Sequence, residues 1–287
     1  MRGIILLMSL SLSINLLGQD STIKITKKEI GTYICAGYLQ DRGGDGYYTY
    51  SELSGRLVKQ NHLIGAFVGV ANVGCEFNRY VYKDLEFFLG FNFTRWGKFN
   101  DAYSYTFSIS PSFKHFSDYG KDKGGSGDEV WQRDWGNQVY ASLNISDAKN
   151  RPFRNCKLSL QYQTAFWSER EGTNIQEGFI TDRVNVTAVN RSFFKTQLET
   201  AVRKVNFGDA AKIEPKLVFG YLWDIGSSKS MYETGAGFGI SFTKEGRYYE
   251  AFNLQYRLRV DKAFMIKNHL DVIEVGLDPQ NLVKLLF

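Results

Sequence analysis

The feature that most constrains the fold is a strict alternation of apolar and polar residues from Tyr103 to Lys114. Tyrosine, phenylalanine, isoleucine and proline occupy the odd positions, while serine, threonine and lysine occupy the even ones. Because successive side chains of a strand point to opposite faces, this segment is expected to be a strand with one apolar and one polar face. His115 and Ser117 continue the apolar series, next to the longest polar segment of the chain.

The same alternation recurs along the chain, with turn residues between the runs. It predicts an all-β fold, a transmembrane antiparallel β-barrel of about twelve strands, each of the length that outer-membrane barrels use or slightly longer. The expected strands cover residues 29–39, 47–58, 63–76, 85–97, 102–117, 137–146, 156–168, 179–189, 193–204, 212–223, 230–243 and 248–260.

The C-terminal tail, residues 261–287, is ambiguous. Residues 281–287 alternate and end on the aromatic Phe287, as outer-membrane barrels commonly do. This would add two strands, at 266–277 and 280–287, and bring the total to fourteen. Residues 268–276 alternate poorly, however, and fit a helix as well.

The N-terminal residues 1–18 read as a secretory signal peptide, with one positive charge, an apolar stretch and a small residue near the cleavage point. The barrel domain then spans residues 19–287. No later segment has the roughly 18 consecutive apolar residues of a transmembrane helix. A secreted β-sandwich is the rival fold, but the strand lengths and the 15% aromatic content favour the barrel.

The connections alternate between long and short, which predicts long loops on the outer rim, short turns on the periplasmic rim, and His115 near the outer surface. The net charge of +5 is not clustered into a basic stripe, which argues against nucleic acid. The polar strand faces carry both signs, so a lumen filled by paired charges is favoured over an anion-selective pore.

His115 and Ser117 are the candidates for catalysis. On one strand face they lie roughly 6.5 to 7 Å apart at the backbone, within reach of each other's side chains. A serine becomes nucleophilic when a histidine takes its proton and a third polar group orients that histidine. Asn137, on the apolar-face parity of the next strand, is one candidate orienter, and Glu129 in the preceding loop is the other.

A family resemblance adds to this reading. The run His115-Phe116-Ser117-Asp118, followed by Trp135-Gly136-Asn137, resembles the active-site region of outer-membrane phospholipase A. Those enzymes carry His-x-Ser-Asn-Gly-Arg at the outer end of a strand and Trp-Asn at the start of the next. Residues 82–91 resemble the family's strand before the catalytic one. The chain departs from the pattern at residues 118–119 and in its longer loop.

This resemblance implies a twelve-stranded barrel with Ser117 as nucleophile, His115 as base and Asn137 as orienter. It also implies Ca²⁺ near the oxyanion site and activity in a homodimer. Ser126 and Asp128 in the glycine-rich loop are the nearest guesses for calcium ligands. A lipid A deacylase also uses His-x-Ser with a glutamate, a role that Glu129 would fit.

Two classes of function follow. The first is an outer-membrane acyl hydrolase of phospholipid esters, whose acyl substrate would lie along Phe107, Pro111 and Phe113, with outer-membrane lipids as partners in a Gram-negative bacterium. The second is a non-enzymatic barrel, either a porin-like channel or a protein that binds ligands through its surface loops. The two differ in whether His115, Ser117 and Asn137 converge on the outer surface.

Overall fold

The computed structural model describes residues 27–41, 44–77, 80–122, 129–149, 151–172, 192–207, 211–225, 230–244, 247–261 and 270–279. Nearly all of them lie in strands. The strands are β1 (Lys27–Asp41), β2 (Gly44–Lys59), β3 (His62–Phe77), β4 (Tyr80–Lys98), β5 (Tyr103–Asp122), β6 (Glu129–Asp147), β7 (Asn155–Gly172), β8 (Phe193–Ala201), β9 (Val205–Phe207), β10 (Ala211–Asp224), β11 (Ser230–Lys244), β12 (Arg247–Asp261) and β13 (Leu270–Leu277).

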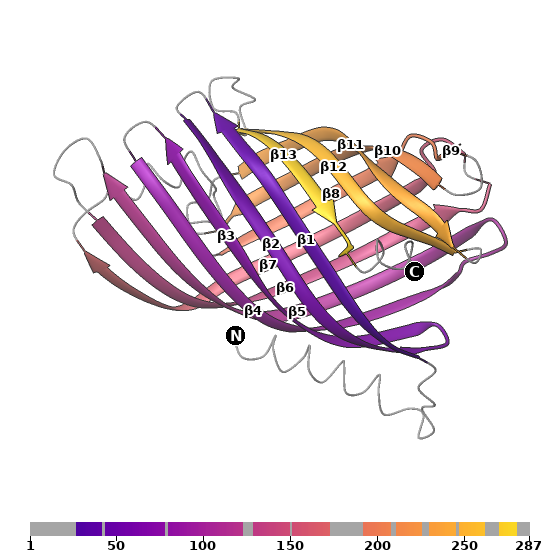
Figure 1. Cartoon of the computed structure of the whole chain (residues 1–287), viewed down its shortest axis with the longest axis horizontal. Coiled ribbons are helices and arrows are strands. Elements are labelled where there is room, and N and C mark those ends of the chain that lie inside the picture. Colours follow the sequence, from indigo (N-terminus) through magenta and orange to yellow (C-terminus); the bar gives the residue numbers. More distant parts are fainter. Residues whose placement is uncertain are drawn as a thin grey trace.

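These strands form a closed antiparallel barrel (Figure 1). Neighbours in sequence pair with each other, and β13 pairs with β1 to close the sheet. The three-residue β9 continues β8 along the same edge of β10 after a bulge at residues 202–204. Twelve strands therefore make up the wall, and the predicted all-β barrel of twelve strands is confirmed.

The observed strands include one that the predicted set of twelve left open. The expected strand at 179–189 lies outside the described residues, and β7 pairs with β8 from Asn155 to Gln163. The twelfth strand is β13, in the tail where the sequence left strand and helix open. Its pairing with both β12 and β1 satisfies two edges that would otherwise stay exposed. Residues 280–287 and the predicted signal peptide lie outside the described residues.

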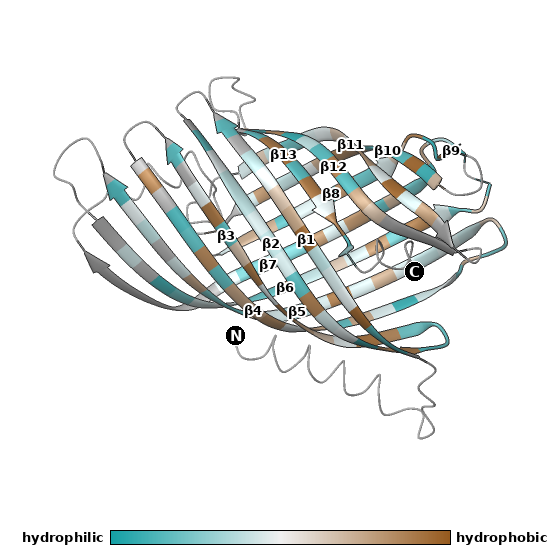
Figure 2. Ribbon diagram, in the orientation of Figure 1, coloured by the Kyte–Doolittle hydropathy of each residue, from teal (hydrophilic) through white to brown (hydrophobic). Residues whose placement is uncertain are grey.

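The two faces of the wall have opposite chemistry. Large apolar side chains are exposed on the outside, for example Phe87 at 52% and Phe91 at 63%, whereas Lys114, Gln163 and Arg257 are buried inside. Figure 2 shows the resulting alternation of hydrophobic and hydrophilic bands along the strands. Apolar outside and polar inside is the arrangement of a barrel whose outer solvent is lipid.

Strands β4 to β7 are longer than a membrane requires. They contain 18 to 20 residues each. A 20-residue strand tilted by about 40° rises roughly 50 Å, about twice the height of a typical apolar band. β7 runs nine residues, from Thr164 to Gly172, beyond its pairing with β8. We call the rim at which β1, β3, β5 and β7 end the distal rim. The opposite rim, at which β1 begins, is the proximal rim.

This extension corrects the predicted loop at 118–136. β5 continues to Asp122 and β6 begins at Glu129, so only residues 123–128 lie between the two strands. Asn137 is therefore the ninth residue of β6 and does not open it. The sequence pattern missed these strand ends because a strand that projects beyond the lipid has two wet faces and need not alternate.

Among the described residues, no helix is long and apolar enough to cross a membrane. Cys35 is buried and Cys156 is half-buried, and both thiols are free. This agrees with cysteines that act as small packing residues.

Candidate functional site

The predicted catalytic residues lie on the outer face of the β5–β6 hairpin. Phe107 and Phe113 of β5 are exposed on the outside at 39% and 43%, and His115 and Ser117 share their parity. Asn137 stands directly opposite Phe113 on β6, which places it on the same outer face. His115, Ser117 and Asn137 are all partly accessible. The three residues thus share one face, near the distal end of the apolar surface.

Trp135 stands between the histidine and the predicted orienter. It is directly opposite His115, and the two rings meet edge-on with centroids 4.4 Å apart. Trp135 also packs on Phe113 at 5.2 Å. Asn137 is the diagonal neighbour of His115, which corresponds to a backbone separation of about 7 to 8 Å. The side chains of His115, Ser117 and Asn137 form no hydrogen bond with one another in the structure.

The register ranks the two candidate orienters. Asn137 is two residues from Trp135 along β6, whereas Glu129 is six residues away at the start of the strand. Six residues of strand span roughly 20 Å. The backbone therefore brings Asn137, and not Glu129, within reach of His115, while the catalytic roles of both remain predictions.

Side-chain rotation can bring a serine and a histidine at this spacing within hydrogen-bonding distance of each other. Turning the imidazole of His115 away from Trp135 would bring it toward Ser117, two residues further along the same face. Catalytic hydrogen bonds are often long or unformed without substrate and tighten in the complex. The predicted substrate strip, Phe107, Pro111 and Phe113, runs from the site toward the middle of the apolar surface.

The predicted calcium ligands, Ser126 and Asp128, lie outside the described residues. Within the described ranges, no three histidine, cysteine, aspartate or glutamate side chains come together as a metal site. Asp84 and Asp134, on the two strands that flank Ser117, are buried on the inner face, 2% and 1% exposed. These two carboxylates face away from Ser117 and do not form a calcium site beside it.

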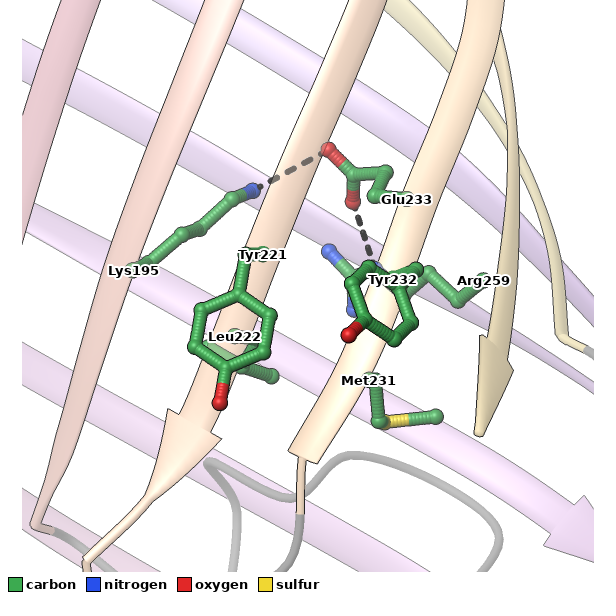
Figure 3. A pocket seen from close by; sticks show the side chains of 7 residues that line it. All are labelled: Lys195, Tyr221, Leu222, Met231, Tyr232, Glu233 and Arg259. Carbon is green, nitrogen blue, oxygen red and sulfur yellow. Dashed lines mark hydrogen bonds and ion pairs between the residues drawn. The ribbon is translucent and has the colours of Figure 1, made fainter. Parts of the chain in front are cut away.

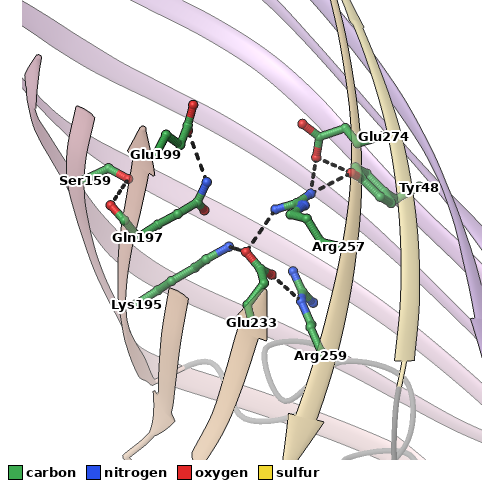
Figure 4. A network of polar contacts seen from close by, with 9 residues as sticks. All are labelled: Tyr48, Ser159, Lys195, Gln197, Glu199, Glu233, Arg257, Arg259 and Glu274. Atoms are coloured by element: carbon green, nitrogen blue, oxygen red, sulfur yellow. Dashed lines mark hydrogen bonds and ion pairs between the residues drawn. The ribbon is translucent and has the colours of Figure 1, made fainter. Parts of the chain in front are cut away.

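The inner face holds charges that pair across strands, as the mixed signs of the polar strand faces predicted. Glu233 of β11 pairs with Arg259 at 2.7 Å and with Lys195 and Arg257 at 3.4 Å each (Figure 4). Arg257 also pairs with Glu274, and Tyr48 donates a hydrogen bond to that carboxylate. The network links strands from β8 round to β2 and carries three cations and two carboxylates.

Glycines allow this network to lie flat on the wall. Gly37 of β1 stands between Tyr48 and Glu274 in the register, and a Cβ there would collide with the Tyr48 ring. Gly220 of β10 is directly opposite Glu233, and a Cβ there would lie 3.1 Å from the Cβ of Glu233. Each glycine lets a long side chain cross its strand and reach a partner two strands away.

The distal end of the network closes on an apolar cluster. Phe193, Leu222 and Met231 pack together beside a small cavity that Lys195, Glu233 and Arg259 also line (Figure 3). On the other side of the lumen, Lys114 pairs with Glu86 at 3.0 Å and lies over the rings of Phe88 and Phe116. Phe116 is fully buried although it faces inward. Paired charges and aromatic rings thus face the lumen from both sides of the wall.

The turn between β6 and β7, at the proximal rim, has its own ion pair. Arg151 donates to Asp147 through Nε at 2.8 Å and through its backbone N–H at 3.0 Å, and the Lys149 N–H donates at 3.2 Å. Hydrogen bonding from Arg151 holds the pKa of Asp147 well below its usual value, although burial of the carboxyl opposes this. The same pairing raises the pKa of Arg151.

Comparison with known proteins supports the fold. No protein-family model matches the chain, and no curated protein matches it by sequence. Among solved structures, the translocator domain of autotransporter NalP from Neisseria meningitidis superposes with a TM-score of 0.51 at 12% identity, covering 94% of this chain and 96% of that one. The chain has the fold of the outer-membrane β-barrels.

Other outer-membrane barrels are more distant neighbours. The KdgM porin matches with a TM-score of 0.35 and 11% identity over 85% of this chain and 98% of that one. Outer membrane phospholipase A from Escherichia coli gives 0.35 and 11% over 92% and 95%. Similarity at this level does not discriminate between their activities. The function of this outer-membrane barrel must therefore be argued from its own residues.

Proposed function

We propose that this outer-membrane barrel is an acyl hydrolase of membrane phospholipid esters. The observation that supports the proposal is the placement of His115, Ser117 and Asn137 together on the lipid-facing side of the β5–β6 hairpin. Polar side chains on a lipid face are unfavourable near the middle of the bilayer and much less so near its interface. The apolar strip of Phe107, Pro111 and Phe113 below them suits an acyl chain.

The proposed reaction follows from these three side chains. Ser117 Oγ attacks the ester carbonyl while His115 accepts the serine proton, and Asn137 orients the imidazole. The carbon–oxygen bond to the glycerol breaks, and His115 returns the proton to the leaving alcohol. Water, deprotonated by His115, then releases the fatty acid and restores the serine hydroxyl. His115 must leave Trp135 to begin this cycle.

The mixed and paired charges of the inner face favour this activity over an anion-selective, porin-like channel. Glu233, Arg257 and Phe88 are all at least 94% buried although they face inward. An open pore needs accessible lumen groups with one sign of charge at a constriction. The three candidate catalytic side chains, in contrast, are partly accessible on the outside of the wall.

The test is fatty-acid release from phospholipid in mixed micelles by the purified barrel, with calcium or with a chelator. We expect Ser117→Ala to reduce the rate by at least about a thousandfold, the scale of losing a catalytic serine. Ser110→Ala, on the inner face of the same strand, is the matched control and should keep the wild-type rate. Full activity in Ser117→Ala, or none in the wild type with either metal condition, would reject the proposal.

The same assay distinguishes the orienter and the substrate. Asn137→Ala should lower the rate more than Glu129→Ala if Asn137 orients the histidine. A preference for lipid A over glycerophospholipid, with the larger loss in Glu129→Ala, would instead support the deacylase alternative. Chelator sensitivity would support a calcium ion bound through residues 123–128, and sedimentation in the same detergent would test the predicted homodimer.

A further inference from the structure

Two cations flank Ser117 on the outer face of the wall. Lys83 of β4 and Arg133 of β6 share the parity of the exposed residues Leu85 and Trp131, and both cationic side chains are themselves exposed. The register places Lys83 opposite Tyr119 and Arg133 opposite Ser117, one on each side of β5. Among the side chains that the structure describes, neither cation has an ion-pair or hydrogen-bond partner.

The spacing of these cations suits one small anion. β4 and β6 are two strand spacings apart, roughly 10 Å. Lysine and arginine side chains extend far enough to close much of that gap from both sides. Arginine binds phosphate oxygens through two parallel N–H donors, and lysine binds as a point charge. The hydroxyl of Ser117 lies on the strand between them.

The position of the cations along the strands matches the level of lipid headgroups. Toward the middle of the wall, Leu85 and Phe87 are exposed apolar neighbours at 37% and 52%. The ring of Tyr119, opposite Lys83, packs on the ring of Trp131, two residues distal to Arg133, with centroids 4.6 Å apart. Tyrosine and tryptophan gather where apolar membrane meets water. Lys83 and Arg133 therefore stand at the boundary where lipid phosphates lie.

We propose that Lys83 and Arg133 form a binding site for the phosphate of an anionic membrane lipid, whose acyl chains lie over Leu85 and Phe87. This assigns a headgroup class that the proposed hydrolysis does not specify, and binding does not require hydrolysis. The register brings two acidic positions of β7 near the site, because Glu169 stands opposite Arg133 and Glu171 stands opposite Trp131. A negative charge at position 169 is expected to weaken binding of an anion at the arginine, because like charges repel.

The test uses the full-length barrel reconstituted in phosphatidylcholine vesicles that contain brominated lipid. Brominated chains quench Trp131 and Trp135 only on contact, so quenching by brominated phosphatidylglycerol relative to brominated phosphatidylcholine gives a relative affinity. A cation near the membrane surface changes that affinity about fivefold. We expect the Lys83→Gln/Arg133→Gln double variant to lose the preference for the anionic lipid by tenfold or more, and Glu169→Gln to increase it.

Lys98→Gln, at the proximal end of β4, is the matched control and should keep the wild-type preference. The difference in quenching between the two lipids should also disappear in the Trp131→Phe/Trp135→Phe variant, because these two tryptophans report on lipid bound at the site. An unchanged preference in the double variant would overturn the proposal. The proposal would also be overturned if inorganic phosphate abolished the preference while chloride of equal ionic strength did not, because the site would then bind free phosphate. Failure of fatty-acid release would leave this binding result unaffected.

Discussion

At the scale of single residues, Glu233 neutralises more charge than any other side chain in the described network. Its carboxylate faces Lys195, Arg257 and Arg259, and it is 5% exposed. Removing one member of a buried ion cluster leaves the others without compensation and costs about 3–5 kcal/mol. We expect Glu233→Gln to destabilise the barrel by an amount of this size, measured by urea unfolding in detergent.

Glu199→Gln is the control for that experiment. Glu199 also faces the lumen, but it accepts a hydrogen bond from Gln197 at 3.1 Å and takes part in none of the ion pairs given above. Its replacement should change the unfolding free energy by under about 1 kcal/mol, the usual effect away from a buried charge cluster. Equal losses in the two variants would show that Glu233 acts as an ordinary polar lumen residue.

At the scale of structural elements, the β6–β7 turn is held by one carboxylate. Hydrogen bonding from Arg151 lowers the pKa of Asp147 in the folded state. The ionised carboxylate therefore stabilises the turn fully at pH values above the pKa of an aspartate in the unfolded chain, about 3.9. This stabilisation is lost as the pH falls from there through the folded-state pKa. We expect the hydrogen-exchange protection of the Lys149 and Arg151 amides, corrected for intrinsic rates, to fall below about pH 4. Asp147→Asn should reduce this protection at neutral pH, and Asp101→Asn in the neighbouring turn should not. Protection that stays constant down to pH 2 would contradict this account.

The β5–β6 hairpin also shows how far an element can be predicted from its pattern. Residues 102–117 were expected as a strand because their alternation follows the lipid boundary, and β5 includes all but the first of them. The distal parts of β5 and β6 were assigned to a loop, because polar and glycine-rich residues there carry no alternation. A strand needs that pattern only where one of its faces meets lipid.

At the scale of the whole molecule, the lumen determines whether the barrel conducts ions. Fully buried Phe116 and the ion pairs of Glu233 and Arg257 lie on its described inner face. We expect the wild-type protein to form no stable open channel in a planar bilayer. Glu233→Ala/Arg257→Ala should raise the conductance and favour anions, because Lys195 and Arg259 then line the path. Lys83→Ala, on the outer face, is the control, and open wild-type channels would contradict the prediction.

The sequence by itself determined the class of fold and the strand face on which the candidate site residues lie. Alternation places Phe113, His115 and Ser117 on one face wherever the strand lies, because the side-chain period of a strand is two. The same rule places Lys114, Glu233 and Arg257 on the polar face of their strands. These properties are local, since each depends only on a residue's place within its own strand.

Tertiary structure alone decided which residues meet across strands. The register puts Trp135 opposite His115, Arg133 opposite Ser117 and Glu274 beside Gly37, and it closes the barrel with β13. No periodic pattern encodes such pairings, because shifting a strand by two residues keeps every side chain on its face while changing all of its partners. Pairing is set by closure of the whole sheet, in which every edge must find a neighbour.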